Sequence, residues 1–286
     1  MSNHRPAGYF SALAGWLKIL LPVLIGATGQ VAPAAELVLS AELGRMQYRM
    51  AESGASGQLL NREEGTLPTQ HLKARWEQAS RFMELGAWHG GQQISYVGLT
   101  QASLPLLTQT ELKMQGWQWR LGQYWPWLQS SNWGVALGLE HLRIDRHILP
   151  ALGSLPLRET LDSTRAVLGL ESKTEFSSVL GWPLQLAVGV DLLRTLRQEL
   201  AVDSFGLYDP LRLLPAPSTD GRATLRLTLA PNASSQVWFA VQRENFNPGS
   251  TAFQSWTRMG VPASTVRYPG SRQSMQQISV GASWQF

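Results

Sequence analysis

The feature that most constrains this chain is a long run of period-two alternation between residues 183 and 203. Apolar residues alternate with small or polar ones and the pattern continues towards Val202; the first apolar members are Leu184, Leu186, Val188, Val190 and Leu192. Period two is the repeat of a β-strand. This strand would be well over twice the usual soluble length of about 5–6 residues. A strand with one apolar and one polar face needs a hydrophobic environment on one side only.

The same alternation recurs along the chain and predicts ten strands, separated by turn-forming residues. They are expected at residues 36–51, 68–77, 81–96, 110–125, 133–149, 160–176, 183–203, 221–231, 235–247 and 273–286. The connections alternate between short ones, near 78–80, 126–132, 177–182 and 232–234, and long ones, near 52–67, 97–109, 150–159, 204–220 and 248–272.

An even number of strands, with short turns at one end and long loops at the other, is typical of a bacterial outer-membrane barrel. We therefore expect an all-β fold, a transmembrane antiparallel up-and-down β-barrel of about ten strands. Eight or twelve strands stay open, because a hairpin near 52–80 or 248–272 could merge or split.

The amino-terminal segment, residues 1–35, has the pattern of a secretory signal peptide. Basic residues precede a short apolar core at 19–26, and Ala32-Pro33-Ala34 offers a small-residue cleavage site. Residues 36–286 would then form the barrel domain in the outer membrane of a Gram-negative bacterium. The chain has no cysteine, which excludes disulfide scaffolds and thiolate metal sites. Outside the amino terminus it has no run of about 20 apolar residues, which excludes a polytopic helical membrane protein.

The chain ends on an alternating strand that closes with an aromatic residue. Its apolar members include Ile278, Val280, Trp284 and Phe286. This resembles the last strand of outer-membrane barrels, and the resemblance implies recognition by the barrel-assembly machinery. Other aromatic residues lie beside the expected short turns, as in an interfacial aromatic girdle.

Charged residues occupy the face opposite the apolar one, so we expect them to line the interior. These are Glu42, Lys73, Arg75, Glu84, Arg120, Glu140, Glu171, Asp191 and Arg226. Because the two signs nearly balance, paired charges should fill a narrow lumen and leave no wide pore. Arg194 instead falls on the lipid-facing side, near the top of an apolar band about 25 Å tall, where it could contact lipopolysaccharide phosphates.

The alternation of the fifth expected strand predicts a change of phase near Glu140, which would turn Asp145 and His147 into the barrel mouth. A carboxylate that orients a histidine can make a general base. Ten-stranded outer-membrane proteases of the omptin type use such a pair, so Asp145 and His147 are the candidate catalytic residues. No motif for a cofactor or a metal occurs, and none is expected.

Several short stretches, together with the aromatic end, resemble a group of uncharacterised proteobacterial outer-membrane β-barrel proteins. They are Asn61-Arg62-Glu63-Glu64-Gly65, Leu67-Pro68, Gly206-Leu207-Tyr208-Asp209 and Met259-Gly260-Val261-Pro262. The resemblance implies a barrel in the outer membrane and transfers no catalytic residue.

We expect a non-enzymatic barrel with a charge-filled lumen, whose long outer loops contact an unidentified surface ligand. Its other partners would be outer-membrane lipid and lipopolysaccharide, and no nucleic acid is expected because the basic residues are scattered. An omptin-like or lipid-modifying hydrolase and a narrow solute channel are the alternatives.

Overall fold

The computed structural model describes residues 35–54, 56–99, 104–128, 131–151, 154–179, 181–232 and 234–286. The expected signal peptide therefore lies outside the described residues, apart from its last position. The long strands are β1 (Glu36–Ser53), β2 (Leu59–Gln78), β3 (Arg81–Leu99), β4 (Pro105–Leu128), β5 (Ser131–Ile148), β6 (Leu157–Val179), β7 (Trp182–Asp203), β9 (Thr219–Asn232), β10 (Ser235–Phe246) and β13 (Ser271–Gln285). Short strands are β8 (Leu211–Leu213), β11 (Gln254–Arg258) and β12 (Val261–Val266). The described part of the chain contains no helix with the length and apolar character needed to cross a membrane.

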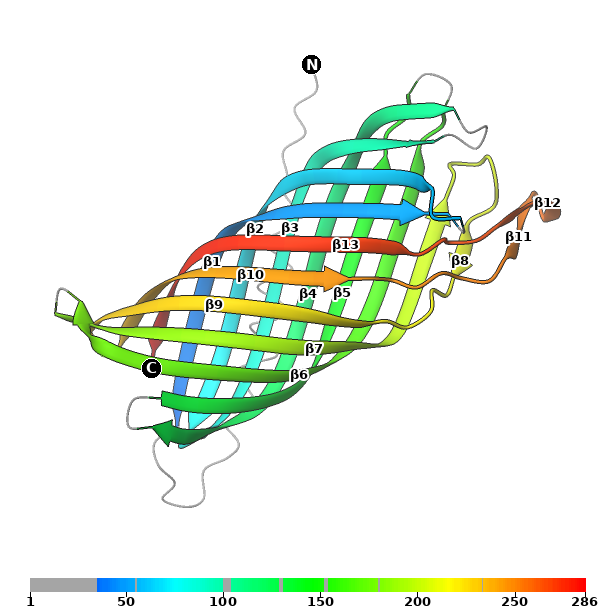
Figure 1. Ribbon diagram of the computed structural model, residues 1–286. Helices are drawn as coiled ribbons and strands as arrows, with labels where there is room; N and C mark the ends of the chain where they lie inside the picture. Colours follow the sequence, from blue (N-terminus) through cyan, green and yellow to red (C-terminus); the bar gives the residue numbers. More distant parts are fainter. Residues whose placement is uncertain are drawn as a thin grey trace. The chain divides into compact units, whose positions relative to one another are not determined.

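The ten long strands form a closed antiparallel barrel (Figure 1). Each strand pairs with its neighbours in the order β6-β5-β4-β3-β2-β1-β13-β10-β9-β7, and the pairing of β6 with β7 completes the ring. Closure leaves no long strand with an unpaired edge, which is what a sheet needs in a medium without water. The ten-stranded barrel predicted from the alternation is confirmed.

The two ends of the barrel differ, as the connection lengths predict. We call the end with the tight turns, where β1 begins and β13 ends, the turn end, and the opposite end the loop end. At the turn end the backbone of Leu37 bonds with that of Phe286 in both directions. At the loop end lie β8 and the hairpin β11–β12 (Figure 1).

The expected long connection at residues 52–67 is wrong. Strand β2 begins at Leu59, so the stretch 61–65 that carries part of the family resemblance lies in the wall and not in a loop. The side chains of Glu63 and Leu67 point inward there, and Arg62 is exposed on the outside. An inward Leu between outward polar groups does not match a lipid-facing strand, which is why this part of the wall was missed.

An apolar band surrounds the barrel on its turn-end half. On β7 it extends from Trp182 to Leu192, about 25 Å at roughly 2.5 Å of vertical rise per residue. That height matches the apolar band of outer-membrane barrels. Exposed aromatic side chains mark its turn-end rim; they are Trp125, Trp133, Phe176, Trp182, Trp284 and Phe286.

Beyond this band the strands continue towards the loop end, and the polarity of their two faces reverses. On β5 the outward Leu137 and Leu139 are exposed, whereas Leu142 and Ile144 are buried inside at 1% exposure each. Even-numbered residues face inward from Gly134 to Ile148 without interruption.

The phase slip expected near Glu140 is therefore wrong. The register of β5 is continuous with both neighbours over this stretch. What changes along β5 is the polarity of the outward residues, as expected where the surroundings of a strand change from lipid, which favours apolar residues, to water, which favours polar ones.

Strand β7 does contain a true shift of register. Arg165 lies opposite Thr195 and Thr164 lies opposite Arg197, so Leu196 has no partner and forms a β-bulge. Odd-numbered residues face inward before the bulge and even-numbered ones after it. The bulge places Leu200 and Val202 in the interior.

The band predicts where a new charge is tolerated. Leu137→Arg places a charge in the middle of the outward apolar band and should lower the free energy of unfolding by about 2–4 kcal/mol. Gln93→Arg, also outward and exposed but beyond the band, should change it by less than about 0.5 kcal/mol. Denaturant titration in lipid vesicles measures both. Equal effects of the two substitutions would contradict the position of the band.

Candidate functional site

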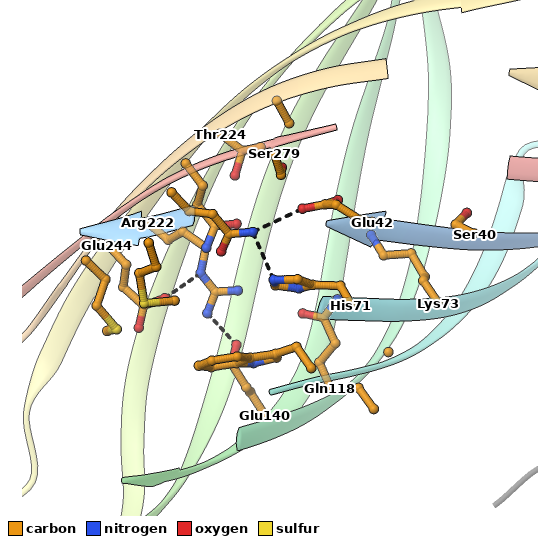
Figure 2. A pocket seen from close by; sticks show the side chains of 18 of the residues that line it. Ser40, Glu42, His71, Lys73, Gln118, Glu140, Arg222, Thr224, Glu244 and Ser279 are labelled. Atoms are coloured by element: carbon orange, nitrogen blue, oxygen red, sulfur yellow. Dashed lines mark hydrogen bonds and ion pairs between the residues drawn. The ribbon is translucent and has the colours of Figure 1, made fainter. Parts of the chain in front are cut away.

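The nine charged residues expected in the lumen all lie on the inward face of the wall. Several of them pair directly: Lys73 and Arg75 both contact Glu84, at 3.3 and 3.4 Å, and Arg120 binds Asp191. Part of this interior is shown in Figure 2. The prediction of a buried, paired charge network is confirmed.

The centre of the network is a closed ring of two arginines and two glutamates. Arg165 donates to Glu140 and, at 2.7 Å, to Glu244. Arg222 donates to the same two carboxylates, at 2.9 Å to Glu244 (Figure 2). All four side chains are buried. β5 and β6 supply one half of the ring and β9 and β10 the other, so the ring bridges five adjacent strands on the inner side of β7.

A second set of contacts fills the lumen towards the turn end. The guanidinium of Arg75 lies 3.8 Å from the centre of the Phe82 ring and donates to the hydroxyl of Tyr124 at 2.9 Å. That hydroxyl donates to Glu171 at 2.7 Å. The ammonium of Lys173 lies 4.3 Å from the centre of the Tyr124 ring. These side chains combine cation–π contact with hydrogen bonds and narrow the opening at the turn end.

Beside the ring lies a cavity of about 100 Å³ with both polar and apolar lining, to which His71 and Glu42 contribute (Figure 2). Gln277 donates to Glu42 at 3.1 Å and lies 2.9 Å from Nε2 of His71. Trp238 donates to Glu42 at 3.3 Å. The indole folds over Gly281, where a Cβ would lie 2.4 Å from the ring, so this position needs glycine. A neighbouring cavity of about 120 Å³ shares Lys73 and Arg226 among its lining residues.

The two cavities have room for a few water molecules each, because one water needs about 10–15 Å³ of such space. Polar side chains that line both cavities, such as Lys73 and Arg226, offer those waters hydrogen-bond partners.

On the loop-end side of the ring, the lumen is filled by a layer of apolar side chains that the charge-based prediction missed. Its buried members are Met46, Tyr48, Met50, Leu67, Ile94, Leu112, Met114, Leu142, Ile144, Leu161, Leu200, Val202, Leu213, Phe246, Trp256, Tyr268 and Met275. They come from the wall and from the two longest outer loops. This layer fills much of the lumen with packed apolar side chains.

A further charge cluster, also missed, lies beyond Leu142 and Ile144 along β5. Arg146 donates to Glu63 at 3.0 and 3.1 Å and also binds Glu52 and Glu159. Thr110 donates to Glu63 at 2.7 Å. One buried arginine thus holds three carboxylates from three other strands.

The two longest outer loops are joined by a latch centred on Asp209. Its carboxylate accepts from the Thr257 hydroxyl at 2.6 Å and from the backbone N–H groups of Met259 and Gly260 at 3.1 and 2.9 Å. The Trp256 indole donates to the backbone carbonyl of Asp209 at 2.8 Å. Met259 and Gly260 both have positive φ, as a two-residue hairpin turn requires. The hydrogen bonds from Thr257 and from Gly260 and Met259 lower the pKa of Asp209 from its ordinary value.

The expected placement of Asp145 and His147 in the barrel mouth is wrong. Both lie on the outward face of β5, with 34% and 27% of their side chains exposed. Asp145 accepts from Arg143 and, at 2.7 Å, from Thr160, whereas His147 lies 3.5 Å from Glu111. No contact joins the two candidates to each other among the described residues.

Arg194 lies where the sequence places it, exposed on the outside at the end of the apolar band, and donates to Thr219 at 2.8 Å. Within the described residues, no group of three or more His, Asp or Glu side chains could hold a metal ion.

The period-two alternation could have predicted the three ring residues that the sequence analysis did not name. Arg165 shares the inward phase of Glu171, Arg222 that of Arg226, and Glu244 that of Trp238. The alternation could not predict the apolar layer. If lipid is assumed to surround the whole length of each strand, these apolar residues are assigned to the lipid-facing side.

The comparisons with known proteins concern the fold. The structure is similar to that of the outer-membrane protease OmpT from Escherichia coli, with a TM-score of 0.64 and 9% identity, covering 91% of this chain and 99% of that one. The translocator domain of the autotransporter NalP from Neisseria meningitidis is similar with a TM-score of 0.45 and 9% identity, covering 97% and 96%. No protein-family model and no curated protein matches the chain in sequence.

The ring predicts a large penalty for the loss of one arginine. Arg165→Leu leaves Glu140 and Glu244 with Arg222 as their shared cation and should lower the free energy of unfolding by about 3–5 kcal/mol. The matched control is Arg212→Leu, whose side chain is 79% exposed beside Glu199 and should cost less than about 1 kcal/mol. Guanidinium titration at neutral pH measures both. Adding Glu244→Gln should restore part of the loss; equal costs for the two arginines would contradict the ring.

The latch predicts both a mutational and a pH effect. Asp209→Ala should speed tryptic cleavage after Arg258 in the adjoining hairpin turn, whereas Glu199→Ala, which removes another loop-end carboxylate, should leave it unchanged.

Because the folded pKa of Asp209 is lowered from its ordinary value of 3.8, the latch is stable above that value. It is lost as pH falls through the folded pKa. Hydrogen exchange should show the Met259 and Gly260 amides protected at about pH 5 and unprotected only in stronger acid. Loss of protection already near neutral pH would contradict the latch.

Proposed function

We propose that this chain is an integral outer-membrane barrel with a closed lumen, and that its function is carried by its loop end through contact with a surface ligand. An apolar band about 25 Å tall, an aromatic rim and a closed ring of strands support its position in a membrane. The short turns would face the periplasm and the long loops the exterior.

The observation that carries the closed lumen is the stacking of two different barriers. The ring of Arg165, Glu140, Arg222 and Glu244 fills the side of the interior lined by β5 to β10, and an ion entering it would have to separate buried pairs. The layer next to it is mostly apolar, so an ion passing through it would lose much of its hydration without replacement. These two barriers favour a closed barrel over a narrow solute channel.

The surface available for a ligand lies at the loop end. The latch holds the hairpin β11–β12 in one position, so its exposed side chains are presented by an ordered element. Met259 at its tip is 90% exposed and Val261 beside it 65%. Exposed apolar side chains on a rigid loop are suited to contact with a partner.

The positions of Asp145 and His147 do not favour an omptin-like hydrolase. A general base needs its orienting carboxylate within hydrogen-bond reach, and Asp145 is instead bound to Arg143 and Thr160. OmpT is a protease with a similar fold, but fold alone does not carry an activity.

The last strand suits the proposed assembly signal. Ile278, Val280 and Trp284 are exposed on the outside of β13, and Phe286, which follows its last residue, is exposed as well. They form an accessible apolar row that the barrel-assembly machinery could bind before the barrel inserts into the membrane.

The closed lumen predicts the absence of current. Purified protein in a planar bilayer should give no steady unitary conductance, and proteoliposomes should not swell in a small sugar. A variant without residues 254–266, which form the hairpin β11–β12, should also stay closed, because wall side chains fill most of the lumen. Heat-modifiable migration on a denaturing gel verifies that both proteins are folded barrels. Steady currents from the intact chain would sink the proposal.

A further inference from the structure

Four exposed arginines lie on the outward face of three adjacent strands. Arg45 and Arg49 belong to β1, Arg243 to β10 and Arg272 to β13, which lies between them. We call these four residues the arginine patch. They are far apart in the sequence and are brought together only by the pairing of the last strand with the first.

The register places the four guanidinium groups around a polar floor. Arg243 lies opposite Gln276, which lies opposite Gln47 on the other side. Arg45 is two residues from Gln47, so Arg45 and Arg243 are two strands and two residues apart, on the order of 12 Å between Cα atoms. Long side chains reach from both sides into the space between them.

The remaining two arginines border the same floor on the loop-end side. Arg49 lies opposite Ser274, and Arg272 lies opposite Ala51, which makes Arg49 and Arg272 diagonal neighbours. Diagonal neighbours are about 7–8 Å apart, within reach of long side chains.

The patch has a surplus of positive charge. Among the described residues, Arg45, Arg243 and Arg272 have no carboxylate within 4 Å, and Arg49 shares Glu64 with Arg62. The opposite side of the barrel differs. There Arg143 contacts Asp145 and Asp162, and His147 lies beside Glu111. The four arginines of the patch thus form a local surplus of positive charge where β10, β13 and β1 meet.

The patch begins where the apolar band ends. Leu43, Val241 and Ile278 are the last exposed apolar residues on these three strands, and each is followed towards the loop end by a polar outward residue. In the membrane position proposed above, the patch lies at the headgroup level of the outer leaflet.

We propose that the arginine patch binds the phosphate groups of a phosphorylated glycolipid of the outer leaflet. The guanidinium fork matches two phosphate oxygens at once, and charge assistance strengthens those bonds. Gln47, Gln276 and Ser274 supply amide and hydroxyl groups for the sugar. The inference rests on the proposed membrane position, and it extends the lipid contact proposed for Arg194 to a site built from four residues.

The test compares binding of purified diphosphoryl lipid A to wild-type protein and to the triple variant Arg45→Gln, Arg243→Gln, Arg272→Gln. The matched control is Arg197→Gln, Arg212→Gln, Arg258→Gln, which removes the same charge from exposed positions elsewhere. Titration in detergent micelles should show a Kd raised about tenfold or more in the patch variant and unchanged in the control. Dephosphorylated lipid A should bind wild-type protein as weakly as the patch variant binds the phosphorylated form.

Equal affinity of patch variant and control would overturn the proposal, as would equal binding of phosphorylated and dephosphorylated lipid. Displacement of lipid A by inorganic phosphate or heparin at comparable concentration would assign the patch to a soluble anion and reject the lipid. Heat-modifiable migration on a denaturing gel tests whether the triple glutamine variant folds. If it does not, the triple lysine variant at the same positions keeps the charge. It should bind lipid A more tightly than variants with a single Arg→Gln substitution in the patch. If the proposal of a closed lumen is wrong, the planar bilayer will show current, and the affinities for lipid A will be unchanged.

Discussion

In the membrane position proposed above, the structure depends on one constraint: every long strand passes through two media. Over the apolar band the outside is hydrocarbon, so outward residues are apolar and polar groups turn inward. Beyond the band the outside is water, and the preference of each face reverses. Residues of β5 show this within a few positions, since Leu139 is outward and exposed whereas Leu142 is inward and buried. A continuous strand can satisfy both media only if its composition, and not its register, changes at the boundary.

The interior follows from that constraint. Charges enclosed by the wall have little water around them, so they must find each other. Arg165, Glu140, Arg222 and Glu244 do so in a closed ring at the loop-end edge of the band. Beyond the band many inward residues are apolar and pack as in a soluble protein, next to the buried cluster of Arg146 with its three carboxylates. The lumen is thus filled by two kinds of contact with opposite dependence on water. A solute that tolerates one of them is stopped by the other.

At the loop end, the packing of the interior continues into the outer loops. The apolar layer continues into the outer loops through Trp256 and Tyr268, and the carboxylate of Asp209 fixes the hairpin turn that follows Trp256. Outward polar residues are unequal around the wall, with paired charges near Arg143 and a surplus of arginine where β10, β13 and β1 meet. A filled barrel can therefore be specific on its outside, where partners of different chemistry meet different faces.

Period-two alternation is a local property, so the sequence alone determined the strands, their number, the apolar band and the inward phase of residues such as Glu84 and Arg226. The same local pattern misled at residues 59–67 and at Asp145 and His147, because it does not say which medium lies outside. Only the tertiary structure decided which inward side chains meet. Arg165 and Glu244 are 79 residues apart, and their contact depends on closure of the ring and on the stagger between strands. Arg243 and Arg45 likewise become near neighbours only because the last strand pairs with the first.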